Sequence, residues 1–280
     1  VPMIALAWIL IAVFMPSHCQ KVQGGIKLDG VGVVLTMVAF GPLVLLLNFG
    51  GNIFPWVSIE TAVMLGIVVV AVVLLVRNER KVPDPIFPPS IIGHKACMFC
   101  FCMAVLFAVA TTVGNYLPTF AQSILGLNAT IAGSLSVPSL IISIIGSSLL
   151  GRYIAKKGVY KGPMLLWALA TLAASVLFGM FSGVTPVWFI LITTATMGLG
   201  QMSQQVIPFT FPTSVLPKEL IAPGIAFMSF GQQLGTATAN AVYGAVSNAF
   251  GFMGMFQVPL VAAGIMIVLA FLFKDTKKLS

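Results

Sequence analysis

The sequence has few charged residues, and the centres of its long apolar stretches have none. Only 7% of the 280 residues are charged and 59% are hydrophobic, whereas about a quarter of residues are charged in a typical soluble domain. The acids are Asp29, Glu60, Glu79, Asp84, Glu219 and Asp275. A proton relay inside a membrane needs ionisable groups at depth, so we expect none within this chain.

Cysteine and phosphate-binding motifs are also scarce. Three of the four cysteines, Cys97, Cys100 and Cys102, follow His94, and a metal site on the cytoplasmic side is one interpretation. Their place on an apolar helix favours the other interpretation, as small hydrophobic residues. A phosphate-binding loop needs a Gly-Lys pair, and the sequence contains none. We expect neither a cofactor nor an enzymatic activity.

The basic residues that are present follow a pattern that predicts a membrane orientation. All fourteen fall in every second gap between the apolar stretches: 21 and 27; 77, 80, 81 and 95; 152, 156, 157 and 161; 218; and 274, 277 and 278. By the positive-inside rule these gaps are cytoplasmic and face the anionic inner leaflet. This explains the net charge of +8 better than a nucleic-acid surface would, and it predicts a multi-pass plasma-membrane protein with a cytoplasmic C-terminus.

Apolar windows of about twenty residues, enough to cross the hydrocarbon core, predict an all-α protein with nine transmembrane helices. They cover residues 1–15, 30–49, 57–76, 97–117, 131–151, 163–182, 187–207, 221–246 and 257–273. A proline-rich inner loop with Pro83, Pro85, Pro88 and Pro89 separates the first three from the last six. We expect residue 1 to be an interior point of a longer protein, and the first helix to be cut short.

Two predicted helices carry small residues at a spacing of four, which marks faces where helix backbones approach closely in lipid. One face has Ser139, Ser143, Ser147 and Gly151, and the other has Gly231 and Gly235. The sequence leaves two interpretations open. These faces are static packing contacts, or they allow the sliding that alternating access requires.

Polar stripes run along three of the predicted helices. They comprise Thr111 or Thr112, Asn115, Thr119 and Gln122; Thr194, Met197, Gln201 and Gln204 or Gln205; and Gln232 or Gln233, Thr236 and Asn240. Residues at these intervals share a helix face. Interhelical hydrogen bonds average only about 0.6 kcal/mol in membranes, which favours a hydrated cavity over a purely packing role, although both interpretations stay open.

Several short motifs occur in a fixed order along the chain. They are Leu28-Asp29-Gly30-Val31-Gly32, Gly50-Gly51 with Trp56, Pro83-Asp84-Pro85-Ile86-Phe87, Tyr116-Leu117-Pro118 with Gln122 and Gly126, Ala132-Gly133 with Pro138, Gly198-Leu199-Gly200, and Gln233-Leu234-Gly235. Their order and spacing resemble the C-terminal part of a major facilitator superfamily transporter of the fourteen-span drug:proton antiporter, or multidrug-resistance, family.

The resemblance implies an incomplete major facilitator fold. Residues 1–15 would be the last span of an N-terminal half, residues 16–95 an inner linker, a two-helix insert and the proline-rich loop, and residues 96–280 a six-helix bundle with a cytoplasmic tail. The loop from Gly151 through Arg152 to Gly158 resembles a gating motif of the superfamily, but Ala155 stands in the place of its Asp. That departure puts an Asp-dependent gate in doubt.

The resemblance further implies export of small lipophilic organic molecules in exchange for protons, together with an N-terminal half that carries the coupling residues. We expect the bundle to form one wall of a central cavity. Candidate hydrogen-bonding residues are Asn115, Tyr116, Gln201, Gln205 and Gln232, and candidate apolar contacts are Phe107, Phe120, Met197 and Phe227. The alternative is a channel subunit or receptor-like interaction protein on a truncated bundle. A channel would need repeated filter glycines or ion-coordinating rings, and none is evident in the sequence.

Overall fold

The computed structural model describes residues 29–50, 55, 57–82 and 89–273. Regular structure in these residues is helical, without a β-strand. The elements are α2 (Gly30–Phe49), α3 (Ile59–Glu79), α4 (Pro89–Gly93), α5 (Lys95–Thr111), η1 (Thr112–Tyr116), α6 (Leu117–Ser123), α7 (Ala129–Ser134), α8 (Val137–Lys157), α9 (Lys161–Gly179), α10 (Val187–Val215), η2 (Lys218–Leu220), α11 (Ile221–Met255) and α12 (Val258–Leu272). The predicted span over residues 1–15, most of the linker and proline-rich loop, and the tail lie outside the described residues.

Each of the eight predicted helices in the described part of the chain coincides with a helical segment, so the all-α membrane fold is confirmed. By length and composition five segments could cross a membrane: α2, α3, α5 to α6, α7 to α8, and α9. A sixth is added if α11 and α12, bent by 82° at their junction, count as one span. The long helix α10 is less apolar because Gln201, Gln204 and Gln205 interrupt it. The total of nine crossings stays a prediction.

Local sequence explains where several helices begin and end. The Asp29 carboxylate accepts a hydrogen bond from the Gly32 amide (2.8 Å) and caps α2, because the first amides of a helix lack helical partners. Asn128 caps α7 in the same way through the Ile131 amide (2.8 Å). At the end of α8, Gly158 takes the left-handed conformation (φ 61°) that favours glycine.

The first span of the bundle is interrupted where the sequence predicted one continuous helix. After Thr111 the chain tightens into the 3₁₀ segment η1 and then resumes as α6. Pro118 has no amide hydrogen to donate to the Gly114 carbonyl, and the Leu117 amide bonds that carbonyl instead. Thr119 and Gln122 therefore lie in α6, beyond this break, and both are exposed.

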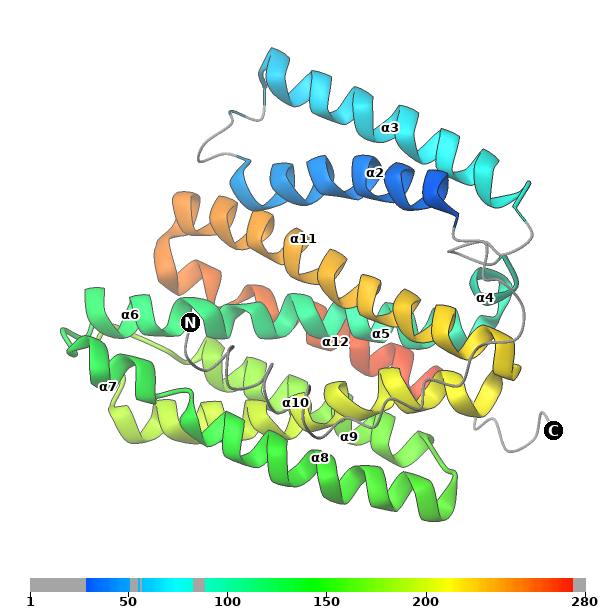
Figure 1. Cartoon of the computed structure of the whole chain (residues 1–280). Helices are drawn as coiled ribbons and strands as arrows, with labels where there is room; N and C mark the ends of the chain where they lie inside the picture. The colour runs from blue at the N-terminus through cyan, green and yellow to red at the C-terminus, as the bar shows by residue number, and fades with distance from the viewer. Residues whose placement is uncertain (1–28, 51–54, 56, 83–88, 274–280) are drawn as a thin grey trace, which may run out of the picture.

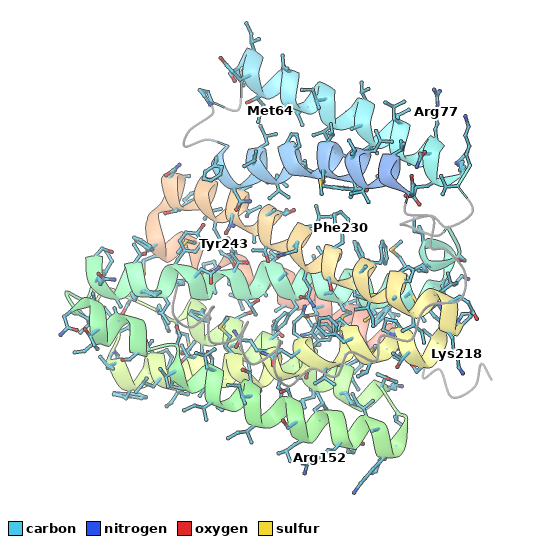
Figure 2. All side chains as sticks on the ribbon, in the orientation of Figure 1. Met64, Arg77, Arg152, Lys218, Phe230 and Tyr243 are labelled. Carbon is cyan, nitrogen blue, oxygen red and sulfur yellow. The ribbon has the colours of Figure 1, made fainter. Side chains whose placement is uncertain are left out.

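The helices are stacked in layers, as Figure 1 shows, with α3 outermost and α2 between α3 and α11. Within the bundle α8 packs mainly on α10, α5 on α11, and α9 on α10 and α12. Arg77 and Lys218 lie at one end of the helices (Figure 2), and α8 ends toward the same side with Lys156 and Lys157 in its last turn. We call this the basic end. The alternation of basic gaps along the sequence therefore corresponds to one face of the fold.

The predicted small-residue faces contain close helix contacts. A Cβ atom added at Gly235 would lie 2.5 Å from the Val105 carbonyl oxygen of α5, and one added at Gly198 would lie 2.8 Å from the Ser139 carbonyl oxygen of α8. Ser139 and Ser143 are buried, whereas Ser147 is half-buried. These contacts explain why α5–α11 and α8–α10 approach so closely, and they do not test whether the faces slide.

The other predicted gating and packing residues are distributed differently. At Gly231 an added Cβ would lie 2.7 Å from the Phe101 ring, so this position is closely packed. At Gly151 an added Cβ would meet nothing within 4 Å. Arg152 is exposed, as is Gly158 at the end of α8.

Candidate functional site

A cavity of about 310 Å³ lies among the helices that carry the predicted polar stripes. It is lined by residues of α5, η1, α6, α8, α10 and α11, together with Ser136, which caps α8. The lining residues are Thr111, Thr112, Gly114, Asn115, Leu117, Ser136, Ser139, Leu140, Thr194, Met197, Gln201 and Thr236. Hydroxyl and amide groups dominate this set, which is unusual for helices that face lipid or an apolar core. We call it the polar cavity.

The interruption of the first bundle span helps to shape the polar cavity. The 3₁₀ segment places Thr112, Gly114 and Asn115 in one wall. Gly114 has no side chain where the Met197 methyl group of α10 approaches, and a Cβ there would lie 2.9 Å from that methyl. The glycine therefore lets the methionine enter between the two helices.

Most hydroxyl groups in the wall are already bonded to the backbone of their own helix. Thr112 donates to the Ala108 carbonyl (2.7 Å), Thr236 to the Gln232 carbonyl (3.0 Å) and Ser139 to the Ser136 carbonyl (2.8 Å). These hydroxyl groups can still accept a hydrogen bond from a ligand, but their hydrogens are already donated to the backbone.

The amides of Asn115 and Gln201 are different. Among the described residues neither side chain has a hydrogen-bond partner, and Asn115 is exposed while Gln201 is half-buried. Each amide offers two donor hydrogens and an acceptor oxygen. These two side chains are therefore the groups best able to orient a molecule inside the polar cavity.

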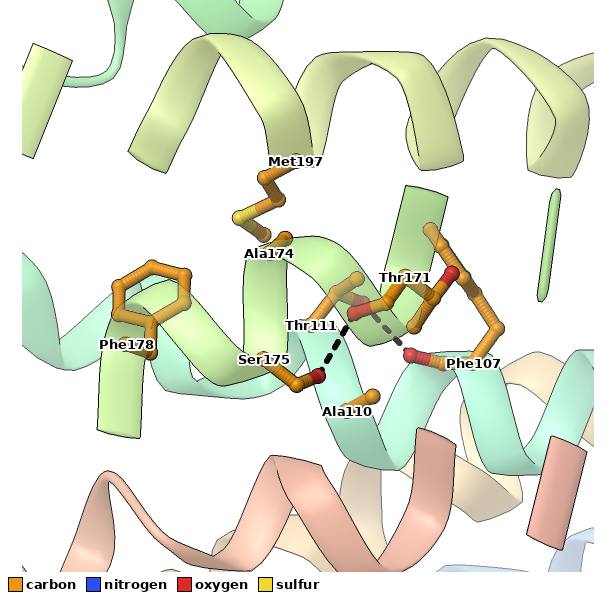
Figure 3. A pocket seen from close by; sticks show the side chains of 8 residues that line it. All are labelled: Phe107, Ala110, Thr111, Thr171, Ala174, Ser175, Phe178 and Met197. Atoms are coloured by element: carbon orange, nitrogen blue, oxygen red, sulfur yellow. Dashed lines mark hydrogen bonds between the residues drawn. The ribbon is translucent and has the colours of Figure 1, made fainter. Parts of the chain in front are cut away.

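A small void adjoins the polar cavity and shares Thr111 and Met197 with it (Figure 3). Its volume is about 10 Å³, roughly the space that one water molecule needs. Thr111 donates to the Phe107 carbonyl (2.9 Å) and Ser175 to the Thr171 carbonyl (2.8 Å) at its edge. Met197, only 7% exposed, is a flexible apolar side chain between the two spaces.

Of the nine candidate substrate-binding residues, three line the polar cavity: Asn115, Gln201 and Met197. Gln205 is exposed and outside this lining. Gln232 is half-buried, and its side-chain nitrogen has no hydrogen-bond partner within the described part. Tyr116 packs its ring against Tyr243, with centroids 5.7 Å apart.

The candidate phenylalanines lie elsewhere. Phe107 lines the small void and contacts Trp167, with ring centroids 5.5 Å apart. Phe120 is completely buried, with its ring centroid 5.0 Å from that of Phe256. Phe227 is stacked on Phe101 at 4.3 Å and faces a groove beside the insert. An aromatic residue in an apolar helix packs in a core as readily as it lines a cavity, and the sequence carries no signal that separates the two.

The polar cavity also contains residues that the sequence did not indicate, and one residue of a predicted polar stripe lies outside it. Leu117 and Leu140 line the polar cavity, but their apolar character gave no sequence signal. Asn240, at the end of the α11 stripe, instead donates to the side-chain oxygen of Asn48 in α2 (2.5 Å). This hydrogen bond ties the insert to the bundle, so Asn240 has a structural contact.

No ionisable side chain is present among the residues that line the polar cavity. Cys97 and Cys100, in contrast, are fully buried in the apolar core near the basic end, which fits small hydrophobic residues. The polar cavity can therefore offer hydrogen bonds and dispersion contacts, but no charge, to a bound molecule.

Comparison of the sequence with known proteins identifies the family to which it is similar. The Major Facilitator Superfamily model matches residues 3–239. An MFS-type transporter, calB, of Penicillium decumbens is 27% identical over 75% of this chain and 38% of its own length. The acetylaranotin efflux transporter ataA of Aspergillus terreus is 28% identical over 78% of this chain and 49% of its own length.

A bacterial relative is similar over a shorter part. The multidrug transporter protein MdtP of Bacillus subtilis is 27% identical over 54% of this chain and 28% of its own length. The chain thus spans less than half the length of these relatives. Since the family model matches most of its residues, this helical membrane chain belongs to the major facilitator superfamily of transporters.

Proposed function

We propose that this chain is the C-terminal part of a secondary transporter that exports small lipophilic organic molecules, and that the polar cavity is its share of the binding site. The observation that carries the proposal is the convergence of three polar stripes on one cavity with two unpartnered amides, Asn115 and Gln201. The names of two relatives, an efflux transporter and a multidrug transporter, point the same way.

In this proposal a lipophilic molecule is held largely by dispersion and is oriented by a few hydrogen bonds. Met197 and Leu140 supply flexible apolar surface, which suits ligands of varied shape. Asn115 in η1 and Gln201 in α10 supply donors and acceptors. An uncharged cavity with adaptable walls fits a broad range of neutral or weakly polar substrates.

Coupling to protons would come from elsewhere in the protein. Within residues 97–273 the only acid is Glu219, in η2 near the basic end, and there is no histidine. An antiport mechanism needs a group that titrates at depth. We therefore place the proton-carrying groups in an N-terminal half that packs against this bundle and closes the cavity.

Orientation follows from the basic end. Arg77 and Lys218 lie there (Figure 2), α8 ends toward it with Lys156 and Lys157, and basic segments favour the cytoplasmic side with its anionic lipids. We propose a multi-pass plasma-membrane protein whose C-terminus is cytoplasmic, with the segment from Gly151 to Gly158, which forms the last two turns of α8 and its C-cap, at the inner mouth of the cavity. The small-residue faces between α8 and α10 would permit movement between inward and outward states.

A pair of amide substitutions tests the binding role. Efflux of Nile red, a neutral lipophilic dye, is measured in cells that express the full-length protein with Asn115→Leu or, as the matched control, Gln122→Leu. Gln122 lies in the same span and is exposed like Asn115, but it is outside the lining of the polar cavity and donates to the Pro118 carbonyl (3.2 Å). Loss of one hydrogen bond to the substrate costs about 0.5–1.5 kcal/mol. The efflux rate constant should therefore fall roughly two- to tenfold for Asn115→Leu and stay unchanged for Gln122→Leu.

The amount of folded protein must be measured alongside efflux. Detergent-extracted monomer, followed by size-exclusion chromatography, should be equal for the two variants because Asn115 has no partner to lose among the described residues. Equal efflux in both variants, or a fall in efflux that only follows a fall in folded protein, would favour the packing interpretation of the stripe.

A further inference from the structure

A second, larger cavity lies between the two-helix insert and the bundle. Its volume is about 520 Å³, and its walls come from α2, α3, α4 and α11, with Arg80 directly after α3. It extends along α3 from Val72 to Arg80, which at 1.5 Å per residue is about 12 Å of helix. Figure 1 shows α3 outermost, with α2 between it and α11, and α4 is close to the basic end. We call this space the insert groove.

The walls of the insert groove are apolar and held in place by ring contacts. The centroids of Phe40 and Phe230 are 4.4 Å apart in an edge-to-face arrangement, and Phe227 is stacked on Phe101 at 4.3 Å. Leu75 is 4% exposed and faces the groove. The first pair connects α2 to α11 and the second connects α11 to α5, so the groove is a space between packed helices. A single hydrocarbon chain fits such walls by dispersion.

One end of the insert groove is basic. Arg80 lines it and is exposed, Arg77 and Lys81 lie on either side along the chain, and Lys95 begins α5 just after α4. Glu79, the acid in the groove wall, is 8% exposed and already takes part in a contact within the protein. Asp29 is also bonded within the protein, since Asn78 donates to it (2.7 Å). The exposed charge at this end is therefore positive.

We propose that the insert groove binds one anionic phospholipid, with an acyl chain along the apolar walls and the phosphate at Arg80. An apolar groove that opens beside basic groups at the end of a helix bundle matches the chemistry of such a lipid, because the headgroup region and the apolar chain lie at corresponding depths. Since α3 packs mainly on α2, the lipid would also join α3 to α4 and α11. The occupant is separate from any molecule in the polar cavity.

Native mass spectrometry of the full-length protein tests this proposal. The protein is exchanged into detergent with either phosphatidylglycerol or phosphatidylcholine of identical acyl chains, and the number of retained lipids is counted. Wild-type protein should retain one phosphatidylglycerol in preference to phosphatidylcholine. Arg80→Gln should weaken phosphatidylglycerol retention about fivefold, the effect of removing one basic group near an anionic surface, and Arg80→Lys should restore most of it.

Matched variants separate the groove from the rest of the basic end. Lys156→Gln removes a positive charge from the exposed last turn of α8 and should leave retention unchanged. Leu75→Trp should block the groove and abolish retention of both lipids. Leu74 is outside the groove lining and 45% exposed, so Leu74→Trp should leave lipid retention unchanged. A size-exclusion profile for each variant verifies that it is folded.

Three results would overturn the proposal. Equal retention of the two lipids would show that the basic end does not select the headgroup. Equal effects of Arg80→Gln and Lys156→Gln would show that the lipid lies elsewhere. Displacement of phosphatidylglycerol by tetraphenylphosphonium, with that displacement lost in Glu79→Gln, would assign the groove to a lipophilic cation instead.

Discussion

Gly235 provides a sharp test of how closely α11 and α5 are packed. Replacing it with alanine would place a Cβ atom 2.5 Å from the Val105 carbonyl oxygen and 2.8 Å from the Ala108 Cβ. The first neighbour is backbone, which cannot rotate away, so the two helices must separate. Overpacking of this kind costs about 1–3 kcal/mol. Within a helix the same substitution also gains about 1 kcal/mol from the better propensity of alanine.

Gly264 on α12 is the matched control, because a Cβ there would meet nothing within 4 Å. The propensity gain is common to Gly235→Ala and Gly264→Ala and cancels in their difference. The free energies of unfolding should therefore differ by about 1–3 kcal/mol, or roughly 5- to 150-fold in the ratio of folded to unfolded protein.

The assay is unfolding by sodium dodecyl sulfate in mixed micelles, followed by the reaction of Cys97 and Cys100 with a thiol dye. Both thiols are completely buried and become reactive when α5 loses its packing. Identical unfolding midpoints for the two variants would refute the close contact between α11 and α5, and with it the interpretation of the Gly231–Gly235 face as a packing surface.

Two further predictions concern the insert and the proton. A double-mutant cycle of Asn48→Leu and Asn240→Leu, measured by the same unfolding assay, should give a coupling energy of about 0.6–1.7 kcal/mol. The reason is the hydrogen bond that Asn240 of α11 donates to Asn48 of α2. Additive effects of the two single substitutions would contradict this prediction. Glu219→Gln should leave substrate-driven proton uptake by reconstituted full-length protein unchanged, because Glu219 is an exposed residue of η2. Loss of proton uptake in that variant would place the coupling group in this bundle.

The helices themselves were predictable from the sequence because an apolar run long enough to cross a bilayer has few other stable conformations. Predicted residues 30–49 coincide with α2, and most other boundaries lie within a few residues of those found. The 3₁₀ segment was not predicted, although Gly114 and Pro118 were a usable signal. The sharp turn at Gly251, where φ is 69°, lies between the predicted spans 221–246 and 257–273. The helical residues on both sides of that turn, up to Met255, were not predicted.

The candidate site was only partly predictable. A stripe along one helix shows which residues share a face, but it does not show which face meets which neighbour. Asn115 and Gln201 lie together only because η1 and α10 meet at the polar cavity. Asn240, one turn from Thr236 on the same stripe, faces the insert instead. The placement of Phe120 in the core likewise depends on Phe256, which lies in the turn between α11 and α12.

The central claim, that the polar cavity is hydrated and receives the transported molecule, is tested most directly by substrate protection of a cysteine at Thr236. In a protein whose native cysteines are replaced by serine, Thr236→Cys should react with a water-soluble methanethiosulfonate, and the neutral dye Nile red should slow that reaction. Val261→Cys on α12 is 68% exposed but faces lipid if the helices span the membrane as proposed, so it should stay unreactive with or without the dye. An unreactive Thr236→Cys, or a reaction that Nile red does not slow, would contradict the claim.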